Sequence, residues 1–541
     1  MTRFVRSLTS RTVRPRGLVR LFFGLLLLLG LAIFADYGVS WDEPADRING
    51  LVSACYVADL AAPRWAARLL WLQQTQPFAV FLEKDHGVLF ELPLAFYDQL
   101  RPSTDSRTYY LVRHLCTFLV SMAGIWALYR IGRRRFEDWR LGLLTAGALV
   151  LSPRFFAESF YNAKDIVFMA LFTLAFFTLT RLLARPTWRR ALLHGAATAA
   201  AIDVRVLGLL LVPLTLGALA LEALFDPAAD PAHRRRLAGS AGLYLGAAAL
   251  ATVAGWPYLW SAPWTNLRQA FDNMSHFRWV GQVLYLGTRE WSTQLPWHYL
   301  PVWIAVTTPV VYLLAAATGI LGLLGALLRR PLALLRTAAG RLDLLLLGWL
   351  LGPLLLVIGL KSVVYDGWRH LYFVYPALLL LGVRGVMVLH TAARATPARR
   401  RLGRLAAGLA LLAVAHTAWR MVRLHPQQQV YFSFLSPAQA ERLFERDYWG
   451  LSYRQALERL LAQQPQGRIR VSGEHNVLVS NNFLILTPAQ QSRLSLGDTS
   501  PGSFLLSSYR PPPGPYRDST GREVFSLQPG GLRILSVFER P

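Results

Sequence analysis

Long apolar segments separated by short arginine-rich clusters make up most of the chain. Eleven such segments lie near residues 18–34, 108–129, 141–156, 165–183, 191–203, 205–224, 237–255, 301–327, 342–360, 370–390 and 405–423. At about 1.5 Å per residue, most are long enough to cross a hydrocarbon core of about 30 Å. With 54% apolar and 16% charged residues, we expect an α-helical polytopic membrane protein. No Ala-x-Ala cleavage pattern precedes Asp36, so we expect the first segment to be a retained helix rather than a signal peptide.

The basic clusters indicate how the segments are oriented. They lie at Arg133–Arg135, Arg189/Arg190, Arg234–Arg236, Arg329/Arg330 and Arg399–Arg401. Basic loops stay in the cytoplasm, and counting 141–183 and 191–224 as two-helix hairpins puts every cluster there. The net charge of +26 then reflects loop anchoring, and nucleic acid is not an expected partner. The outward segments are 36–107, 152–164, 203–205, 256–300, 361–369 and 425–541.

The chain changes character after the last apolar segment. Residues 1–424 form the expected membrane part, with 36–107 as its first outer loop, and residues 425–541 form a small α/β domain on the extracytoplasmic side. Ser452 and Gln455 have the spacing of a capping box at a helix start. The segments Arg468–Val471, Ser503–Ser508 and Leu532–Phe538 have the composition of short strands.

Two adjacent carboxylates, Asp42 and Glu43, lie directly after the first apolar segment and before Pro44. One interpretation is a helix start, where acidic residues complement the helix dipole and proline fits the first turn. The other is a functional pair, since a carboxylate fixed at such a position can serve as a general base or a metal ligand. The sequence favours neither interpretation.

Lysine is rare in this chain. Only Lys84, Lys164 and Lys361 occur among 57 basic residues, and all three fall in the expected outward segments. A lysine ammonium is a compact point charge that suits a phosphate oxygen. Snorkelling at the membrane surface is the common alternative for each cation. The placement favours one shared polar site, with these candidate residues: Asp42, Glu43, Lys84, His86, Lys164, Asp165, Arg205, Lys361, Arg369, His370 and Tyr372.

Cations beside a carboxylate at a membrane surface predict a particular chemistry. The cations would bind a phosphate or diphosphate headgroup, and the carboxylate would deprotonate an acceptor hydroxyl. Together they predict group transfer from a lipid phosphate at the outer leaflet.

The ordered series of motifs resembles the GT-C glycosyltransferases of family 39, the group of protein O-mannosyltransferases and lipid A aminoarabinose transferases. The resemblance covers roughly residues 15–425. It rests on Asp42-Glu43 in the first outer loop, Glu83-Lys84 later in that loop, Asp165 at a helix start, Arg205 near a hairpin tip and Arg369-His370-Leu371-Tyr372 before a late helix. The family's two prolines after Glu-Lys are replaced here by Asp85 and His86.

The resemblance implies a GT-C fold and an inverting transfer from a polyprenyl-phosphate-linked sugar. Asp42 would be the base, and Glu43 would orient the acceptor or Asp42. The leaving phosphate would be neutralised by Lys84, Arg205, Lys361 and Arg369, while Asp165 would position Lys164 or Arg205. The loop 45–72 would shape a lipid entrance. The expected location is the bacterial inner membrane, with the site on the periplasmic side.

Several alternatives remain open. A polytopic secondary transporter or lipid flippase is the main rival, although transporters place their charged residues near the bilayer midplane. The acceptor can be a protein, a lipid or a glycan, and the sugar is not encoded in any motif. A divalent metal held by Asp42, Glu43 and His370 is possible, and no cofactor is certain.

Overall fold

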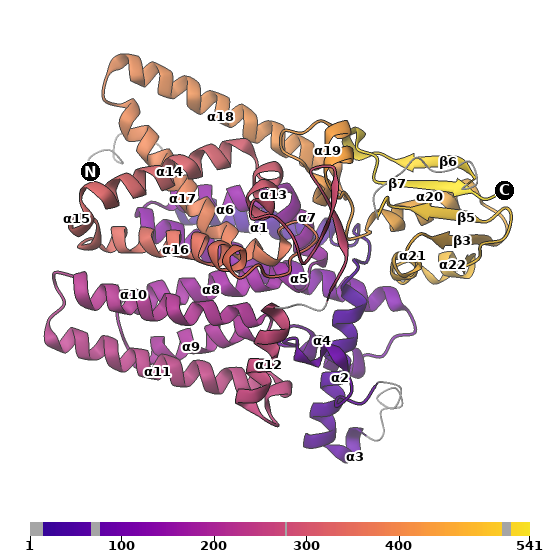
Figure 1. The fold of residues 1–541 in the computed structure, drawn as a ribbon, viewed down its shortest axis with the longest axis horizontal. Helices are drawn as coiled ribbons and strands as arrows, with labels where there is room; N and C mark the ends of the chain where they lie inside the picture. Colours follow the sequence, from indigo (N-terminus) through magenta and orange to yellow (C-terminus); the bar gives the residue numbers. More distant parts are fainter. Residues whose placement is uncertain (1–14, 67–75, 276–278, 511–520) are drawn as a thin grey trace.

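The protein is described by a computed structural model covering residues 15–66, 76–275, 279–510 and 521–541. Its long helices run side by side (Figure 1). Within the described ranges, nine helices are long and apolar enough to cross a bilayer. They are α1 (Pro15–Ile33), α5 (Ser106–Phe136), α8 (Asp165–Ala184), α10 (Leu211–Phe225, after η4, Val206–Leu210), α11 (Pro231–Gly255), α14 (Val310–Arg329), α16 (Ala338–Gly359), α17 (Tyr375–Ala393, after η6, Arg369–Val374) and α18 (Pro397–Leu424).

Two further segments lie where the remaining two of the eleven expected spans were placed, and neither is a straight helix that passes this test by itself. α6 (Trp139–Val150) and α7 (Pro153–Tyr161) pass the same test together but meet at a bend of 72°. The bend follows from Pro153, because proline disfavours helical backbone in the residue before it and starts a new helix well. α9 (Trp188–Ile202) has only 15 residues, a length of about 22 Å. The prediction of a polytopic helical membrane protein is confirmed.

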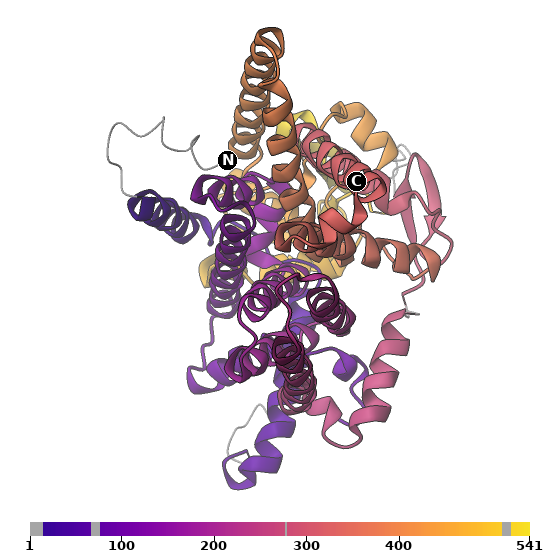
Figure 2. The ribbon, with the colours of Figure 1, turned by 90° about the vertical axis from the view of Figure 1, so that its left-hand side faces the viewer.

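The helices differ in how much protein surrounds them. In α8 and in the η6–α17 segment, 78% of the most apolar window is buried, against 11% in α1 and α18. Figure 2 looks along the helices and shows α1 and α18 at the periphery. Hydrophobic side chains on the outside of these helices face lipid, whereas α8 and α17 form the centre around which the other helices pack.

The expected outward segments lie together at one end of the helices (Figure 1). They contain α2 (Glu43–Ala61), α3 (Pro63–Ala66), η3 (Leu82–Asp85), α4 (Glu91–Leu100), η5 (Pro257–Leu259), α12 (Pro263–Ser275) and the antiparallel strands β1 (Gln282–Tyr285) and β2 (Thr288–Trp291). The span expected at 301–327 is divided into α13 (Tyr299–Thr307) and α14. The loop 45–72 is only partly covered, because residues 67–75 lie outside the described residues. The short α15 (Pro331–Leu335) lies at the opposite end.

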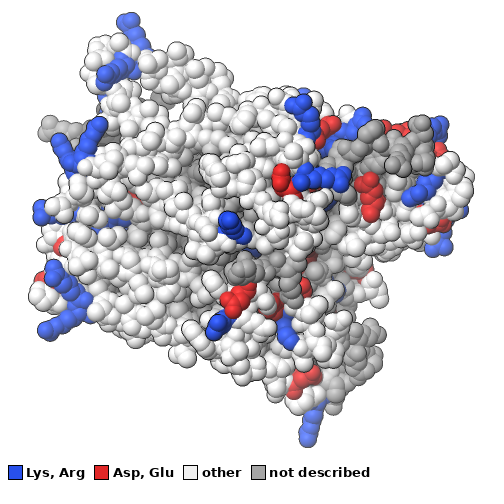
Figure 3. Space-filling model, in the orientation of Figure 1, with Lys and Arg blue, Asp and Glu red and all other residues white. Residues whose placement is uncertain are grey.

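Charge is distributed as a membrane protein requires. In Figure 3 the middle of the molecule is largely uncharged, basic residues stand at the end that carries α15, and both signs mix at the other end. Arg329 and Arg330, next to α15, are exposed. The arginine clusters and the candidate site therefore lie at opposite ends of the helices.

The C-terminal part holds a mixed sheet, as expected. Its strand order is β4-β3-β5-β7-β6, with parallel pairing of β3 to β4 and β5 and antiparallel pairing of β7 to β5 and β6. The elements are α20 (Ser452–Gln463), β3 (Ile469–Gly473), α21 (Asn476–Phe483), α22 (Pro488–Ser492), β4 (Leu494–Leu496), β5 (Phe504–Ser507), β6 (Arg522–Leu527), η9 (Pro529–Gly531) and β7 (Leu535–Glu539).

The expected capping box at Ser452 is wrong. The Ser452 backbone N–H donates to Asp447 Oδ2 at 2.9 Å, and the buried Ser452 hydroxyl has no hydrogen-bond partner among the described residues. Asp447 also accepts the N–H groups of Gly450 and Leu451. The carboxylate five residues upstream therefore takes the role that the sequence pattern assigned to the serine.

Residues 428–451 connect the two parts without forming a free linker. They include η7 (Gln428–Val430) and α19 (Pro437–Leu443), and the side chains of Phe432, Phe444 and Trp449 belong to the core of the membrane helices. The separate apolar core of the C-terminal sheet starts at Tyr453. The C-terminal part is consequently packed directly against the outer end of the bundle.

Candidate functional site

Asp42 precedes α2 but does not cap it. Its side chain forms no capping hydrogen bond, and Oδ2 instead accepts from Arg369 Nη1 at 2.9 Å. About a quarter of the Asp42 side chain (26%) is exposed. The interpretation of this carboxylate as a simple helix cap is therefore not supported by its geometry.

Glu43 turns the opposite way. Only 2% of its side chain is exposed, and Oε1 lies 2.9 Å from His114 Nε2 of α5. Oε2 accepts the Ser40 backbone N–H at 2.6 Å. Both oxygens are thus occupied in holding the loop before α2 against α5, which leaves Asp42 as the accessible member of the pair.

Arg369, at the start of η6, is the centre of the cluster. Its Nη1 also donates to Asp165 Oδ2 at 3.2 Å, and its Nη2 lies 3.3 Å from Asp366 Oδ2. The guanidinium stacks over the Trp449 ring at 4.8 Å. Three carboxylates and an aromatic ring hold this cation in one orientation.

Asp165, the first residue of α8 as predicted, connects Arg369 to two further groups. Its Oδ1 pairs with Arg205, and its Oδ2 accepts from Asn162 Nδ2 at 3.2 Å. Asn162 Oδ1 accepts the Asp165 backbone N–H at 2.7 Å. The carboxylate is buried, and both of its oxygens lie against cationic or amide partners.

Lys164 lies next to this group and pairs with Asp46 Oδ1 at 2.6 Å. Burial lowers the pKa of Lys164, but Asp46 and Asp42 outweigh burial and raise the pKa above its usual value. Burial raises the pKa of Asp42, but Arg369 and Lys164 outweigh it and hold the pKa below the usual value. The pKa of Asp46, in contrast, is raised above its usual value, mainly by burial. Asp42 is therefore ionised at neutral pH.

A second layer of polar contacts supports Asp165. Glu158 of α7 is buried and accepts from Asn162 Nδ2 at 2.8 Å and from the Tyr372 hydroxyl at 2.8 Å. The Tyr448 hydroxyl lies 3.4 Å from the same Glu158 oxygen. Tyr372 therefore contacts the site through Glu158 and Asn162 rather than directly.

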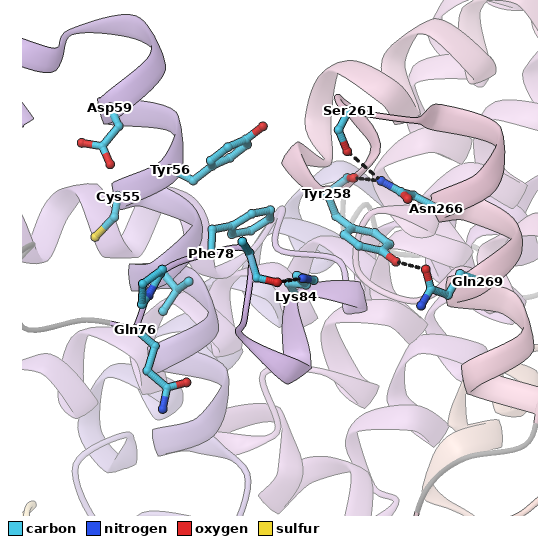
Figure 4. A pocket seen from close by; sticks show the side chains of 13 residues that line it. Cys55, Tyr56, Asp59, Gln76, Phe78, Lys84, Tyr258, Ser261, Asn266 and Gln269 are labelled. Carbon is cyan, nitrogen blue, oxygen red and sulfur yellow. Dashed lines mark hydrogen bonds between the residues drawn. The ribbon is translucent and has the colours of Figure 1, made fainter.

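Lys84 and Lys361 do not join the cluster. Lys84 donates to the Ala79 carbonyl and lines a cavity of about 690 Å³ with Phe78 and Tyr258 (Figure 4). Residues from the last turns of α2, including Asp59, line that cavity. At about 1.5 Å per residue, Asp59 lies about 25 Å along the helix from Asp42. Lys361 ends α16 in a left-handed conformation (φ 50°) and lines another cavity, of about 350 Å³. The prediction of one site that holds all three lysines is wrong, because their segments pack against different neighbours.

The two histidines also have different surroundings. His86 Nδ1 lies 3.1 Å from Glu83 and 3.2 Å from Asp85, and these three form the one group with metal-ligand spacing among the described residues. His370 packs edge-on against Tyr365 at 4.7 Å. Asp42, Glu43 and His370 do not converge, so these three do not form the metal site considered from the sequence.

The structure adds residues that the sequence did not single out. They are Asp46, Glu158, Asp366, Trp449 and Arg510, the last of which pairs with Asp366 at 2.6 Å. Asp46 stands one helical turn after Asp42, and Asp366 lies in an outward segment that was already identified. The sequence positions of Asp46 and Asp366 therefore indicated that they could join the site. Trp449 and Arg510 belong to the C-terminal part, and no sequence pattern connected them with the site.

Residues 110–260 match the family model described as dolichyl-phosphate-mannose-protein mannosyltransferase. The match runs from α5 to the start of the outer loop after α11 and confirms the expected resemblance over this part of the chain. Among curated proteins, none matches.

The fold also aligns with solved structures of other proteins. ArnT from Cupriavidus metallidurans, in the apo state and bound to undecaprenyl phosphate, aligns over 96% of this chain and 98% of its own, with 13% and 14% identity and a TM-score of 0.48. The archaeal oligosaccharyltransferase AglB from Archaeoglobus fulgidus, in complex with an inhibitory peptide and a dolichol-phosphate, aligns over 91% of this chain and 70% of its own, with 11% identity and a TM-score of 0.45.

Proposed function

We propose that the chain is a GT-C-type membrane glycosyltransferase. It moves a sugar from a polyprenyl-phosphate-linked donor to an acceptor on the extracytoplasmic side of the bacterial inner membrane, with Asp42 as general base. The observation that carries the proposal is the accessible, ionised Asp42 carboxylate held by Arg369 at the end of a membrane bundle. The family-model match over residues 110–260 supports the same reaction class.

In the proposed step, the acceptor hydroxyl gives its proton to Asp42 while its oxygen forms a bond to the anomeric carbon. The bond between that carbon and the donor phosphate oxygen breaks, and the lipid phosphate leaves with the bonding electrons. A base that is already ionised needs no activation, and attack opposite the leaving phosphate inverts the anomeric carbon.

Arg369, Arg205 and Lys164 supply the positive charge for the leaving phosphate. Fixed cations stabilise developing negative charge without reorganisation, and Asp165 and Asp366 fix Arg369 here. Glu43 acts as a positioning residue through the loop that carries Asp42. Lys84 and Lys361 line other cavities and have no role in this step.

The position of the cluster favours transfer over transport. Asp42 directly precedes α2, Asp165 begins α8 and Arg369 begins η6, so the charged groups gather where the helices end. A transporter site is expected near the middle of the spans. Uptake of a substrate into vesicles without any glycosylated product would favour the transporter.

The decisive experiment compares Asp42→Asn with Asp59→Asn, an exposed residue of the same helix. Membranes that contain each variant receive a radiolabelled polyprenyl-phosphate sugar together with acceptor extract. Loss of the base should lower transfer by about 100-fold or more with normal protein levels, while Asp59→Asn retains activity. Equal transfer by both variants would remove Asp42 from the mechanism.

A further inference from the structure

Most of α18 is exposed, and one line of its side chains, the stripe, follows the helix toward its outer end. Its members are spaced alternately three and four residues apart, which places them on one face of the helix. They are Leu402, Leu405, Leu409, Leu412, His416, Trp419 and Arg423, and all seven side chains are exposed. The stripe is apolar over its first four members, about 15 Å of helix, and polar and aromatic over the last three.

Two arginines stand at the polar end of this stripe. Arg423 stacks over the Trp419 ring at 5.0 Å, and Arg420 stacks over Tyr431 at 4.4 Å and donates to the Ser433 carbonyl at 3.1 Å. Both line a cavity of about 300 Å³ together with His416. The remaining guanidinium N–H groups are available to an acceptor in this cavity.

The positive charge of Arg420 and Arg423 is unusual at this end of a membrane helix. Basic residues favour the cytoplasmic end of a membrane helix, yet Arg420 and Arg423 lie at the end next to the C-terminal part. Neither has a carboxylate partner among the described residues. Snorkelling would account for a cation at this level, but not for two that line one cavity at the top of an exposed apolar stripe.

We propose that this surface binds an anionic glycerophospholipid of the outer leaflet. The phosphate lies between Arg420 and Arg423, since a guanidinium matches a phosphate with two parallel hydrogen bonds. The acyl chains follow the leucines of the stripe, and Trp419 lies at the headgroup level, where indole rings are enriched.

A second copy of this chain is the other occupant that a three-four spacing suggests. Two copies in one membrane have the same orientation, so a seam along this stripe would place Arg423 of one copy beside Arg423 of the other. Like charges at such a contact are unfavourable, whereas a lipid phosphate neutralises them.

Both the membrane part and the C-terminal part contribute residues to the lining of this cavity. Pro529 and Gly530 of the C-terminal part line it opposite the α18 residues. A bound lipid would therefore join the C-terminal part to the membrane surface. This inference does not depend on the proposed transferase activity.

Native mass spectrometry of the full chain tests the proposal. Detergent-solubilised protein is mixed with phosphatidylglycerol or with zwitterionic phosphatidylcholine, and the retained lipids are counted. Arg423→Gln should bind phosphatidylglycerol about fivefold more weakly than the wild type, because one positive charge is lost. It should therefore retain one phosphatidylglycerol fewer than the wild type. Arg468→Gln, an exposed arginine of the C-terminal part, should retain the wild-type number, and phosphatidylcholine should show no difference.

Three results would overturn the proposal. The first is an unchanged phosphatidylglycerol count in both Arg423→Gln and the Arg420→Gln/Arg423→Gln double variant. The second is a doubled protein mass that Leu409→Asn abolishes, which would assign the stripe to a second copy. The third is release of the lipid by an equal concentration of inorganic phosphate, which would assign the arginines to a free anion.

Discussion

Replacing Arg510 by glutamine tests whether the C-terminal part completes the candidate site. Arg510 Nη2 lies 2.6 Å from Asp366 Oδ1, and only 17% and 7% of the two side chains are exposed. Its Nη1 also donates to the Tyr448 carbonyl at 2.7 Å. Removing one partner of a buried pair costs about 3 kcal/mol, because Asp366 loses its closest cation while it stays buried.

A matched pair in the same part of the chain gives the control. Arg522 lies 2.9 Å from Glu539, with 81% and 39% of these side chains exposed. An exposed pair contributes roughly 0–1 kcal/mol. We expect Arg510→Gln to lower the unfolding midpoint of the full protein in detergent by about 3 °C, against about 1 °C or less for Arg522→Gln.

The substitution should also change catalysis in a specific direction. Asp366 without Arg510 attracts Arg369 more strongly and weakens its contact with Asp42. The pKa of Asp42, which Arg369 and Lys164 hold low against burial, should then rise. The acid limb of the kcat/KM profile should move to higher pH. Equal midpoints for the two variants, or an unmoved acid limb, would refute the argument that the C-terminal part sets the site.

Three further predictions follow from the same contacts. Glu158→Gln should lower kcat about tenfold with normal membrane insertion, since the buried carboxylate holds Asn162 and Tyr372, whereas Glu458→Gln, a half-exposed carboxylate of α20, should leave kcat unchanged. Burial raises the pKa of Glu91 from 4.5 to about 7, so its contribution to stability is present below pH 4.5 and is lost as pH rises through 7. The difference in free energy of unfolding between the wild type and Glu91→Gln should therefore fall by about 3 kcal/mol between pH 4.5 and 7. A difference that does not change with pH in chemical unfolding would contradict the shifted pKa of Glu91. In a Cys55→Ser/Cys116→Ser background, an impermeant thiol reagent applied to intact cells should label Asp498→Cys and not Arg330→Cys, and the reverse pattern would invert the orientation.

The helical part of the fold could be predicted because its signals are local. Apolar length identifies the spans, and Pro153 marks the bend between α6 and α7. The gathering of Asp42, Asp165, Arg205 and Arg369 at one end also followed from counting crossings. These properties depend on neighbouring residues or on simple parity, and a single sequence contains both.

The choice of partners could not be predicted. Arg369 meets Asp42 across 327 residues and Asp165 across 204. The family resemblance separates the roles of Asp42 and Glu43, but no local pattern shows that Asp42 faces Arg369 and Glu43 faces His114. The rarity of lysine suggested a common role for Lys84, Lys164 and Lys361, yet only Lys164 reaches the cluster. Packing between distant segments, which composition does not encode, decides these contacts.

The loop before α2 takes its partners from the opposite end of the chain. The Val39 N–H donates to Asn482 Oδ1 at 3.2 Å, Arg454 donates to the Tyr37 carbonyl at 2.7 Å, and the Trp41 N–H donates to the Trp449 carbonyl at 3.0 Å. During synthesis, residues 37–42 leave the ribosome more than 400 residues before these partners exist. The first helices must therefore insert and pack while Asp42 still lacks its final surroundings. The candidate site is therefore completed late in biogenesis, after the last span and residues 449–482 have been made.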